Sequence, residues 1–122
     1  MSNYWGFHLA VDALGPKLDS IASAETITAW VKDLVKRIDM IAYGEPNVVR
    51  SGTGNKAGIT CVQLIETSNI CVHFVEDDGA GNTSFYLDVF SCKPFDNDVV
   101  LQCCEDYFGK TSNRIHYFVR QA

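Results

Sequence analysis

A serine, a histidine and a cysteine lie close together in the middle of the sequence. Ser68 precedes His73 by five residues, and Cys92 follows further along the chain. Hydroxyl and thiol groups act as nucleophiles or proton donors in enzymes, and histidine is their commonest acid–base partner. The same residue types also have ordinary structural roles in strands. By themselves they do not separate an enzyme from a non-catalytic sheet protein.

The segments around these residues have the patterns of strands. Alternation of apolar and other residues predicts strands over 4–12, 59–66, 69–75, 83–92 and 114–120. In the first of them, Trp5 and Phe7 fall on one side and His8 on the other. The second and third are joined at Thr67-Ser68, so the third begins beside the serine.

The strand over 69–75 divides its residues between two faces. His73 shares one face with Cys71. The opposite face carries the apolar residues Ile70, Val72 and Phe74. Between 43 and 58 the sequence predicts a long irregular loop with a short extended piece at 47–50.

Two helices complete the pattern. Ser23 can cap a helix in which apolar residues recur at helical spacing from Ile27 to Ile38. A second helix is predicted over about 96–108 and ends at Gly109. Each has one apolar stripe, so both should cover one face of a largely antiparallel sheet. The predicted fold is an α+β two-layer sandwich, with residues 1–122 as one domain.

Composition and charge narrow the function further. The 122 residues include 10 Lys+Arg and 15 Asp+Glu, a formal net charge of −5. This balance argues against nucleic acid and anionic membrane surfaces as partners. The five cysteines are an odd number without a CxxC pair, so neither disulfides nor a zinc site are expected. Without a predicted membrane span or signal segment, the expected location is the cytoplasm.

Four motifs resemble those of the small prokaryotic-type S-adenosylmethionine decarboxylases. They are GFHLAVD at 6–12, GIT at 58–60, ETSNICVH at 66–73 and DVFSC at 88–92. Their order and spacing match, and the resemblance covers nearly the whole chain. It implies the same sandwich fold and a proenzyme that cuts itself before an internal serine.

The resemblance implies a role for each candidate catalytic residue. The cut falls between Thr67 and Ser68 and leaves chains 1–67 and 68–122, with Ser68 converted to a pyruvoyl group. His73 is the processing base and Thr60 a helping hydroxyl. Cys92 protonates the carbon left after loss of carbon dioxide, which suits a group that ordinarily titrates near pH 8.5.

The implied cofactor is that pyruvoyl group alone, without a metal. A Schiff base between the substrate amine and the pyruvoyl ketone gives the electrons of the decarboxylated carbon a conjugated sink. The implied substrate is S-adenosylmethionine, whose decarboxylated product donates aminopropyl groups for spermidine synthesis. The implied assembly is a homodimer of processed protomers.

The sequence also departs from the family pattern. Thr67 stands where the family has glutamate, Asn69 follows the serine in place of histidine, and Gly54 lies where many members have an aromatic. Phe7 or Phe74 is therefore predicted to stack on adenine, and Glu76 or Asp77 to accept the ribose hydroxyls. Two alternatives stay open: a pyruvoyl-dependent decarboxylase of ornithine or arginine, and an uncleaved, non-catalytic partner subunit.

Overall fold

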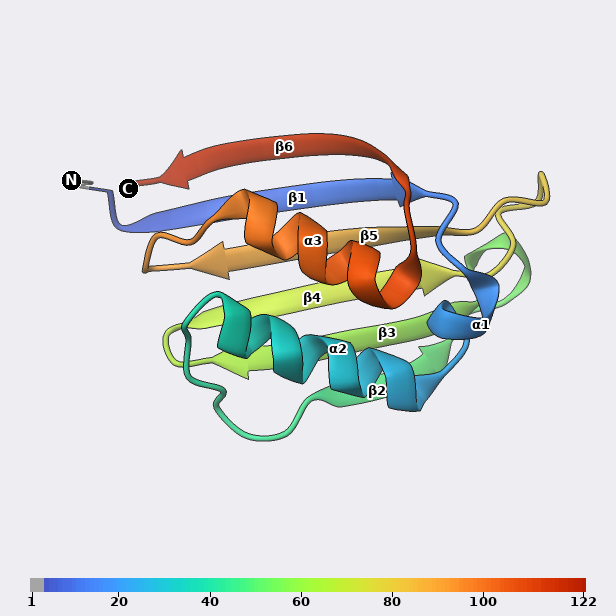
Figure 1. The fold of residues 1–122 in the computed structure, drawn as a ribbon, viewed down its shortest axis with the longest axis horizontal. Helices are drawn as coiled ribbons and strands as arrows, with labels where there is room; N and C mark the ends of the chain where they lie inside the picture. The colour runs from blue at the N-terminus through green and yellow to red at the C-terminus, as the bar shows by residue number, and fades with distance from the viewer. Residues whose placement is uncertain (1–3) are drawn as a thin grey trace.

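A six-stranded antiparallel sheet carries a layer of helices on one face, as Figure 1 shows. The computed structural model describes residues 4–122. The strand order across the sheet is β2-β3-β4-β5-β1-β6. The strands are β1 Gly6–Leu14, β2 Asn47–Ser51, β3 Gly58–Ile65, β4 Ser68–Val75, β5 Ser84–Ser91 and β6 Ser112–Arg120. The predicted α+β sandwich is confirmed.

The helices are α1 Leu18–Ile21, α2 Ala24–Arg37 and α3 Asn97–Phe108, with a short 3-10 turn η1 at Gly54–Lys56. The Ser23 hydroxyl accepts a hydrogen bond from the Thr26 N–H at the start of α2, as its sequence position predicts. In Figure 1, α2 lies over the β2-β3-β4 side of the sheet and α3 over β5 and β1. The four-residue α1 was not predicted, because so short a helix has no periodic pattern of its own.

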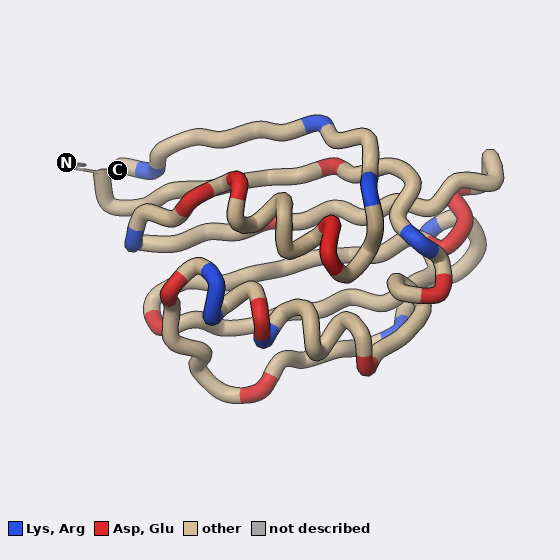
Figure 2. Tube along the Cα trace, viewed as in Figure 1, with Lys and Arg blue, Asp and Glu red and all other residues tan. Residues whose placement is uncertain are grey.

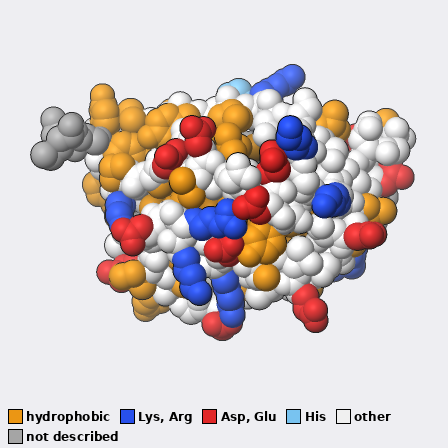
Figure 3. Space-filling view, in the orientation of Figure 1, with side chains coloured by type: hydrophobic (Ala, Val, Ile, Leu, Met, Phe, Trp, Pro, Cys, Tyr) orange, Lys and Arg blue, Asp and Glu red, His pale blue; other side chains and the backbone are white. Residues whose placement is uncertain are grey.

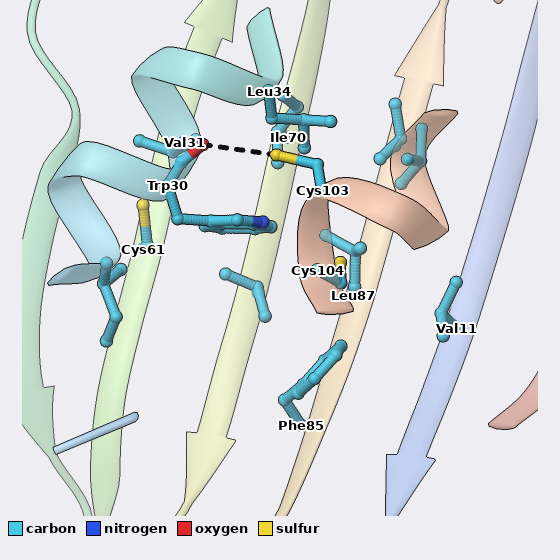
Figure 4. Close-up of a cluster of buried hydrophobic side chains, with 14 of the residues drawn as sticks. Val11, Trp30, Val31, Leu34, Cys61, Ile70, Phe85, Leu87, Cys103 and Cys104 are labelled. Carbon is cyan, nitrogen blue, oxygen red and sulfur yellow. Dashed lines mark hydrogen bonds between the residues drawn. The ribbon is translucent and has the colours of Figure 1, made fainter. Parts of the chain in front are cut away.

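The core lies between the helices and the sheet. Trp30 of α2 is fully buried, and its ring lies against Phe74 of β4 and Phe108 of α3 at centroid distances of 6.1 and 5.2 Å. Figure 4 shows the Trp30 ring between the two helices, with the Cys103 thiol directed at the Trp30 carbonyl. Burial of such large apolar side chains contributes roughly 1.5–3 kcal/mol each. This layer fixes the helices on one face of the sheet.

The other face of the sheet has no covering layer within residues 4–122, and we call it the open face. Along β4, the side chains of Ile70, Val72 and Phe74 face the helices, whereas Cys71 and His73 lie on the open face. This division confirms the predicted alternation. Charged residues lie mostly on the helices and turns (Figure 2), and β3 and β4 contain none.

The structure corrects two local predictions. Trp5 does not share the side of Phe7, because it precedes β1, is 57% exposed and stacks on Phe90. The β3–β4 turn consists of Glu66 and Thr67, not Thr67-Ser68, because Ile65 pairs with Ser68 and makes Ser68 the first residue of β4. Of the described residues, none belongs to a helix that is both long and apolar enough to cross a membrane.

Strand β6 is exposed along its whole length. Its residues Ile115, Tyr117 and Val119 are 40–46% exposed although they pair with core positions of β1. Figure 3 shows hydrophobic side chains gathered at the upper left of the helix-bearing side of the molecule.

Candidate active site

The tight turn between β3 and β4 ends at the Thr67–Ser68 peptide bond, which the resemblance predicts to be cut. Thr67, the second turn residue, has φ +63°. The Glu66 N–H donates to the Ile41 carbonyl at 3.0 Å, and Ala42 forms a bridge with Ile65. The segment around 41–43 therefore fixes the turn from outside the hairpin. Ser68 follows at once and is buried.

Cys92 lies directly beside this turn, just past the end of β5. Its backbone N–H donates to Ser68 Oγ at 3.1 Å. Its Sγ lies 2.7 Å from Thr67 Oγ1, and the Thr67 hydroxyl also donates to the Glu66 carbonyl at 2.6 Å. A hollow of about 220 Å³ adjoins the group, lined by Asp39, Met40, Ile41, Ile65, Glu66, Thr67, Ser91, Cys92 and Lys93. The structure thus brings Thr67, Ser68 and Cys92 together.

A second group forms around His73 on the open face. Its Nε2 lies 2.8 Å from the Lys56 carbonyl oxygen, which can only accept a hydrogen bond. Nε2 therefore carries the proton in the neutral ring, and Nδ1 accepts the hydroxyl proton of Thr60 at 2.6 Å. Thr60 and His73 pair in register on β3 and β4. The arrangement leaves His73 Nδ1 as a hydrogen-bond acceptor for the Thr60 hydroxyl, the pairing that the resemblance implies.

The two groups do not meet within one chain. Along the hairpin, Thr60 pairs with His73 and Ile65 with Ser68, a separation of five residues on each strand. At about 3.3 Å per residue, this places the two pairs roughly 16 Å apart. His73 also lies on the open face, whereas the strand alternation assigns Ser68 to the helix side. His73 therefore cannot reach the hydroxyl of Ser68 in its own chain.

The predicted adenine-stacking residues lie in the core. Phe74 is fully buried among Trp30, Phe85 and Phe108, and Phe7 is 5% exposed on the helix side of β1. Both rings are buried within this chain, and their stacking on adenine stays a prediction. The strand alternation already placed Phe74 beside Ile70 and Val72, on the side that the helices cover.

The predicted ribose-binding carboxylates, half-buried Glu76 and exposed Asp77, both have partners within the chain. Glu76 forms an ion pair with Arg50 at 2.7 Å. Asp77 accepts hydrogen bonds from the backbone N–H groups of Gly79 and Gly81. Both follow the end of β4, so they lie near His73 and at the opposite end of the strand from Ser68.

A polar and aromatic cluster on the open face was not predicted as a unit. Arg120 donates to His8 Nδ1 at 3.2 Å, so His8 carries its neutral-ring proton on Nε2 and donates it to Asp88 at 2.9 Å. The Arg120 guanidinium lies 5.2 Å from the centroid of the Phe90 ring, which stacks on Trp5 at 5.9 Å. The alternation in 114–120 predicts that Arg120 belongs to a strand. Only the pairing of β6 with β1 shows which side chains Arg120 contacts.

The five cysteines differ in their surroundings. Burial raises the pKa of Cys61, Cys103 and Cys104 to about 12. Burial and then the Asp88 carboxylate raise the pKa of Cys71. Cys92 alone among them is exposed. Among residues 4–122, no three His, Cys, Asp or Glu side chains are placed to hold a metal ion together.

Comparison with known proteins identifies the family. The family model described as S-adenosylmethionine decarboxylase matches residues 7–121. The chain belongs to the S-adenosylmethionine decarboxylase family. Its fold matches the crystal structure of the adenosylmethionine decarboxylase from Aquifex aeolicus VF5 with a TM-score of 0.76 and 18% identity, over 99% of this chain and 94% of that one. A search of curated protein sequences finds no significant match.

Membership of the S-adenosylmethionine decarboxylase family makes this chain a member of a carboxy-lyase family. The matched range contains every residue that the sequence singles out, from Phe7 to Cys92. The geometry adds that the candidate catalytic residues form two groups along the β3–β4 hairpin: Thr67, Ser68 and Cys92 at the turn, and Thr60 with His73 toward the other end.

Proposed function

We propose that this chain cuts itself between Thr67 and Ser68 and then decarboxylates S-adenosylmethionine with a pyruvoyl group made from Ser68. One observation carries the proposal: Ser68 follows a tight turn directly, and its Oγ accepts the Cys92 N–H at 3.1 Å. The hydroxyl lies beside the peptide bond to be cut, and the Cys92 N–H can stabilise the negative charge on Oγ when it leaves with the Thr67 carboxylate. The decarboxylated product would supply aminopropyl groups for spermidine synthesis.

The proposed cleavage conserves atoms and charge. Ser68 Oγ attacks the Thr67 carbonyl carbon, the Thr67–Ser68 C–N bond breaks, and the hydroxyl proton goes to the departing nitrogen. A base then removes the Ser68 α-proton. The Cβ–Oγ bond breaks and leaves Thr67 as a carboxylate and residue 68 as a dehydroalanine. Its imine tautomer takes up water and releases ammonia.

The residues beside Ser68 fit the group that this reaction would leave at the start of β4. A pyruvoyl ketone supplies an electron sink for the carbanion formed when carbon dioxide leaves. The exposed Cys92 thiol is next to this position and adjoins the 220 Å³ hollow. We propose that Cys92 donates the proton that replaces the lost carboxyl group.

A second copy of the chain would supply what one chain lacks. His73 and Thr60 lie on the open face, roughly 16 Å along the hairpin from Ser68. Around them the open face bears exposed apolar side chains on four strands: Val49, Leu64, Tyr86 and Phe118. Two such faces can pack about a two-fold axis that lies between them, perpendicular to the strands. The strands of one copy then run in the opposite direction to the same strands of the other. The His73 end of one copy would then meet the β3–β4 turn of the other, where the strands end and the bond before Ser68 can be approached past the edge of the sheet.

Mixing two inactive variants tests this shared site. Ser68→Ala has no nucleophile and His73→Ala no base, so each alone should stay uncut. When the two are refolded together, the His73→Ala chain should be cut with the help of the Ser68→Ala chain. His116→Ala, which removes an exposed histidine of β6, serves as the control and should be cut unaided. Absence of cleavage in the mixture would contradict the shared site.

Release of carbon dioxide from carboxyl-labelled substrates tests the reaction itself. We expect the processed protein to act on S-adenosylmethionine, and Ser68→Ala to be inactive. Preference for labelled ornithine or arginine would instead support the alternative decarboxylase.

A further inference from the structure

We propose that the strained backbone of Thr67 speeds the self-cleavage of this chain, which makes Thr67 a positioning residue of the cleavage step. This inference rests on the proposed self-processing. Among the described residues, only Asp39 and Thr67 have a positive φ without being glycine. Aspartate tolerates this region through its short polar side chain, whereas a β-branched residue there is an outlier. Such outliers gather at functional sites, and this one belongs to the bond to be cut.

The surrounding structure prevents Thr67 from relaxing. Pairing of Ile65 with Ser68 leaves only two residues to reverse the chain. The Glu66 N–H donates to the Ile41 carbonyl, and the Tyr43 N–H donates to the Leu64 carbonyl, so the hairpin end is tied to the neighbouring loop. On the other side, the Thr67 hydroxyl contacts Cys92 Sγ. A strained conformation persists where its neighbours determine it in this way.

The first covalent step releases this strain. When Ser68 Oγ bonds to the Thr67 carbonyl carbon, the C–N bond breaks and the hydroxyl proton passes to the nitrogen. The chain then runs from Thr67 through Oγ and Cβ of Ser68 in place of its nitrogen, so one additional atom separates the strands at the turn. Thr67 can now leave the left-handed region. Energy stored in the uncut turn therefore lowers the barrier to cleavage.

Substitutions at position 67 separate strain from the hydroxyl contact. Thr67→Asn favours positive φ and removes the strain, and Thr67→Gly does so with a more flexible backbone. Thr67→Val keeps the β-branch, and therefore the strain, but removes the hydroxyl. We expect the first-order cleavage rate, followed by denaturing electrophoresis after refolding, to fall about tenfold in Thr67→Asn and Thr67→Gly. Thr67→Val should stay within about threefold of the parent chain.

A second measurement detects the strain without any reaction. In the uncleavable Ser68→Ala background, Thr67→Asn should raise the urea midpoint by about 0.5–1 M. This is the tenfold effect expressed as ~1.4 kcal/mol and divided by a typical dependence on urea. The same background with Thr67→Val should show no rise.

The outcomes are distinguishable. If the parent chain is cut but Thr67→Asn is cut at the same rate, or its urea midpoint is unchanged, the strain proposal is overturned and self-processing stands. Slowing in Thr67→Val equal to that in Thr67→Asn would also overturn it, because the hydroxyl would then matter and not the backbone. A parent chain that stays intact would overturn the proposed function as well.

Discussion

Replacing Gly58 with alanine should separate β3 from β4 next to the Thr60–His73 pair. A Cβ at position 58 would lie 1.8 Å from the Phe74 carbonyl oxygen and 2.9 Å from its carbon. Both are backbone atoms, so no side chain can turn aside to make room. Gly58 is buried at the start of β3, two residues before Thr60. The strands themselves must move apart.

The size of the effect follows from this overlap. Inserting one methyl group into a packed interior costs about 1–3 kcal/mol when side chains can adjust. Here the obstacle is a strand backbone, so we expect Gly58→Ala to lower the free energy of unfolding by about 3 kcal/mol or more. For a chain of this length, that lowers Tm by on the order of 10 °C.

Urea and thermal unfolding in the uncleavable Ser68→Ala background measure this cost without interference from cleavage. Gly54→Ala is the matched control, since a Cβ there meets no atom within 4 Å and the only penalty comes from the backbone φ of +58°. The free energy of unfolding of this control should fall by about 1 kcal/mol. In the cleavable chain, Gly58→Ala should also slow cleavage, because the Thr60–His73 contact shifts. Equal unfolding midpoints for the two variants would refute the close approach of β3 and β4.

Two further predictions concern cysteines and charge. Brief treatment of the folded protein with iodoacetamide should modify the exposed Cys92 first and spare the buried Cys61, Cys103 and Cys104, which peptide mass analysis can check; early modification of Cys61 would contradict its burial. The Arg37 guanidinium and then the Tyr107 hydroxyl lower the pKa of Asp33, so its ionised form stabilises the folded chain above about pH 4 and this contribution is lost at lower pH. Urea midpoints measured between pH 5 and 3 should therefore fall less steeply for Asp33→Asn than for the parent chain, and parallel profiles would contradict the prediction.

Local patterns in the sequence predict the elements well, because strand and helix periods depend on neighbouring residues. The alternation over 69–75 placed Cys71 and His73 on one face, and the structure agrees. The order of the strands in the sheet, in contrast, depends on contacts between residues far apart in the sequence. Pairing of β1 with β5 and β6 joins residues between 70 and 114 positions apart, and no local pattern specifies such partners.

The candidate site shows the same limit. The spacing of Ser68, His73 and Cys92 indicates a set of chemical groups, but a sequence motif contains no distances. A two-residue turn in strict register places Ser68 beside Cys92 and leaves His73 far along the strand. Phe74, for which adenine stacking is predicted, lies on the strand face that the helices cover. The strain at Thr67 is likewise a property of the turn and its neighbours.

The intact mass of freshly refolded protein tests the central claim most directly. The account predicts two fragments, residues 1–67 and residues 68–122. The second should be lighter by one ammonia than a fragment that begins with serine, and its N-terminus should be blocked to stepwise degradation. The Ser68→Ala chain should stay whole. A parent protein that remains a single chain of 122 residues after prolonged incubation would contradict the account.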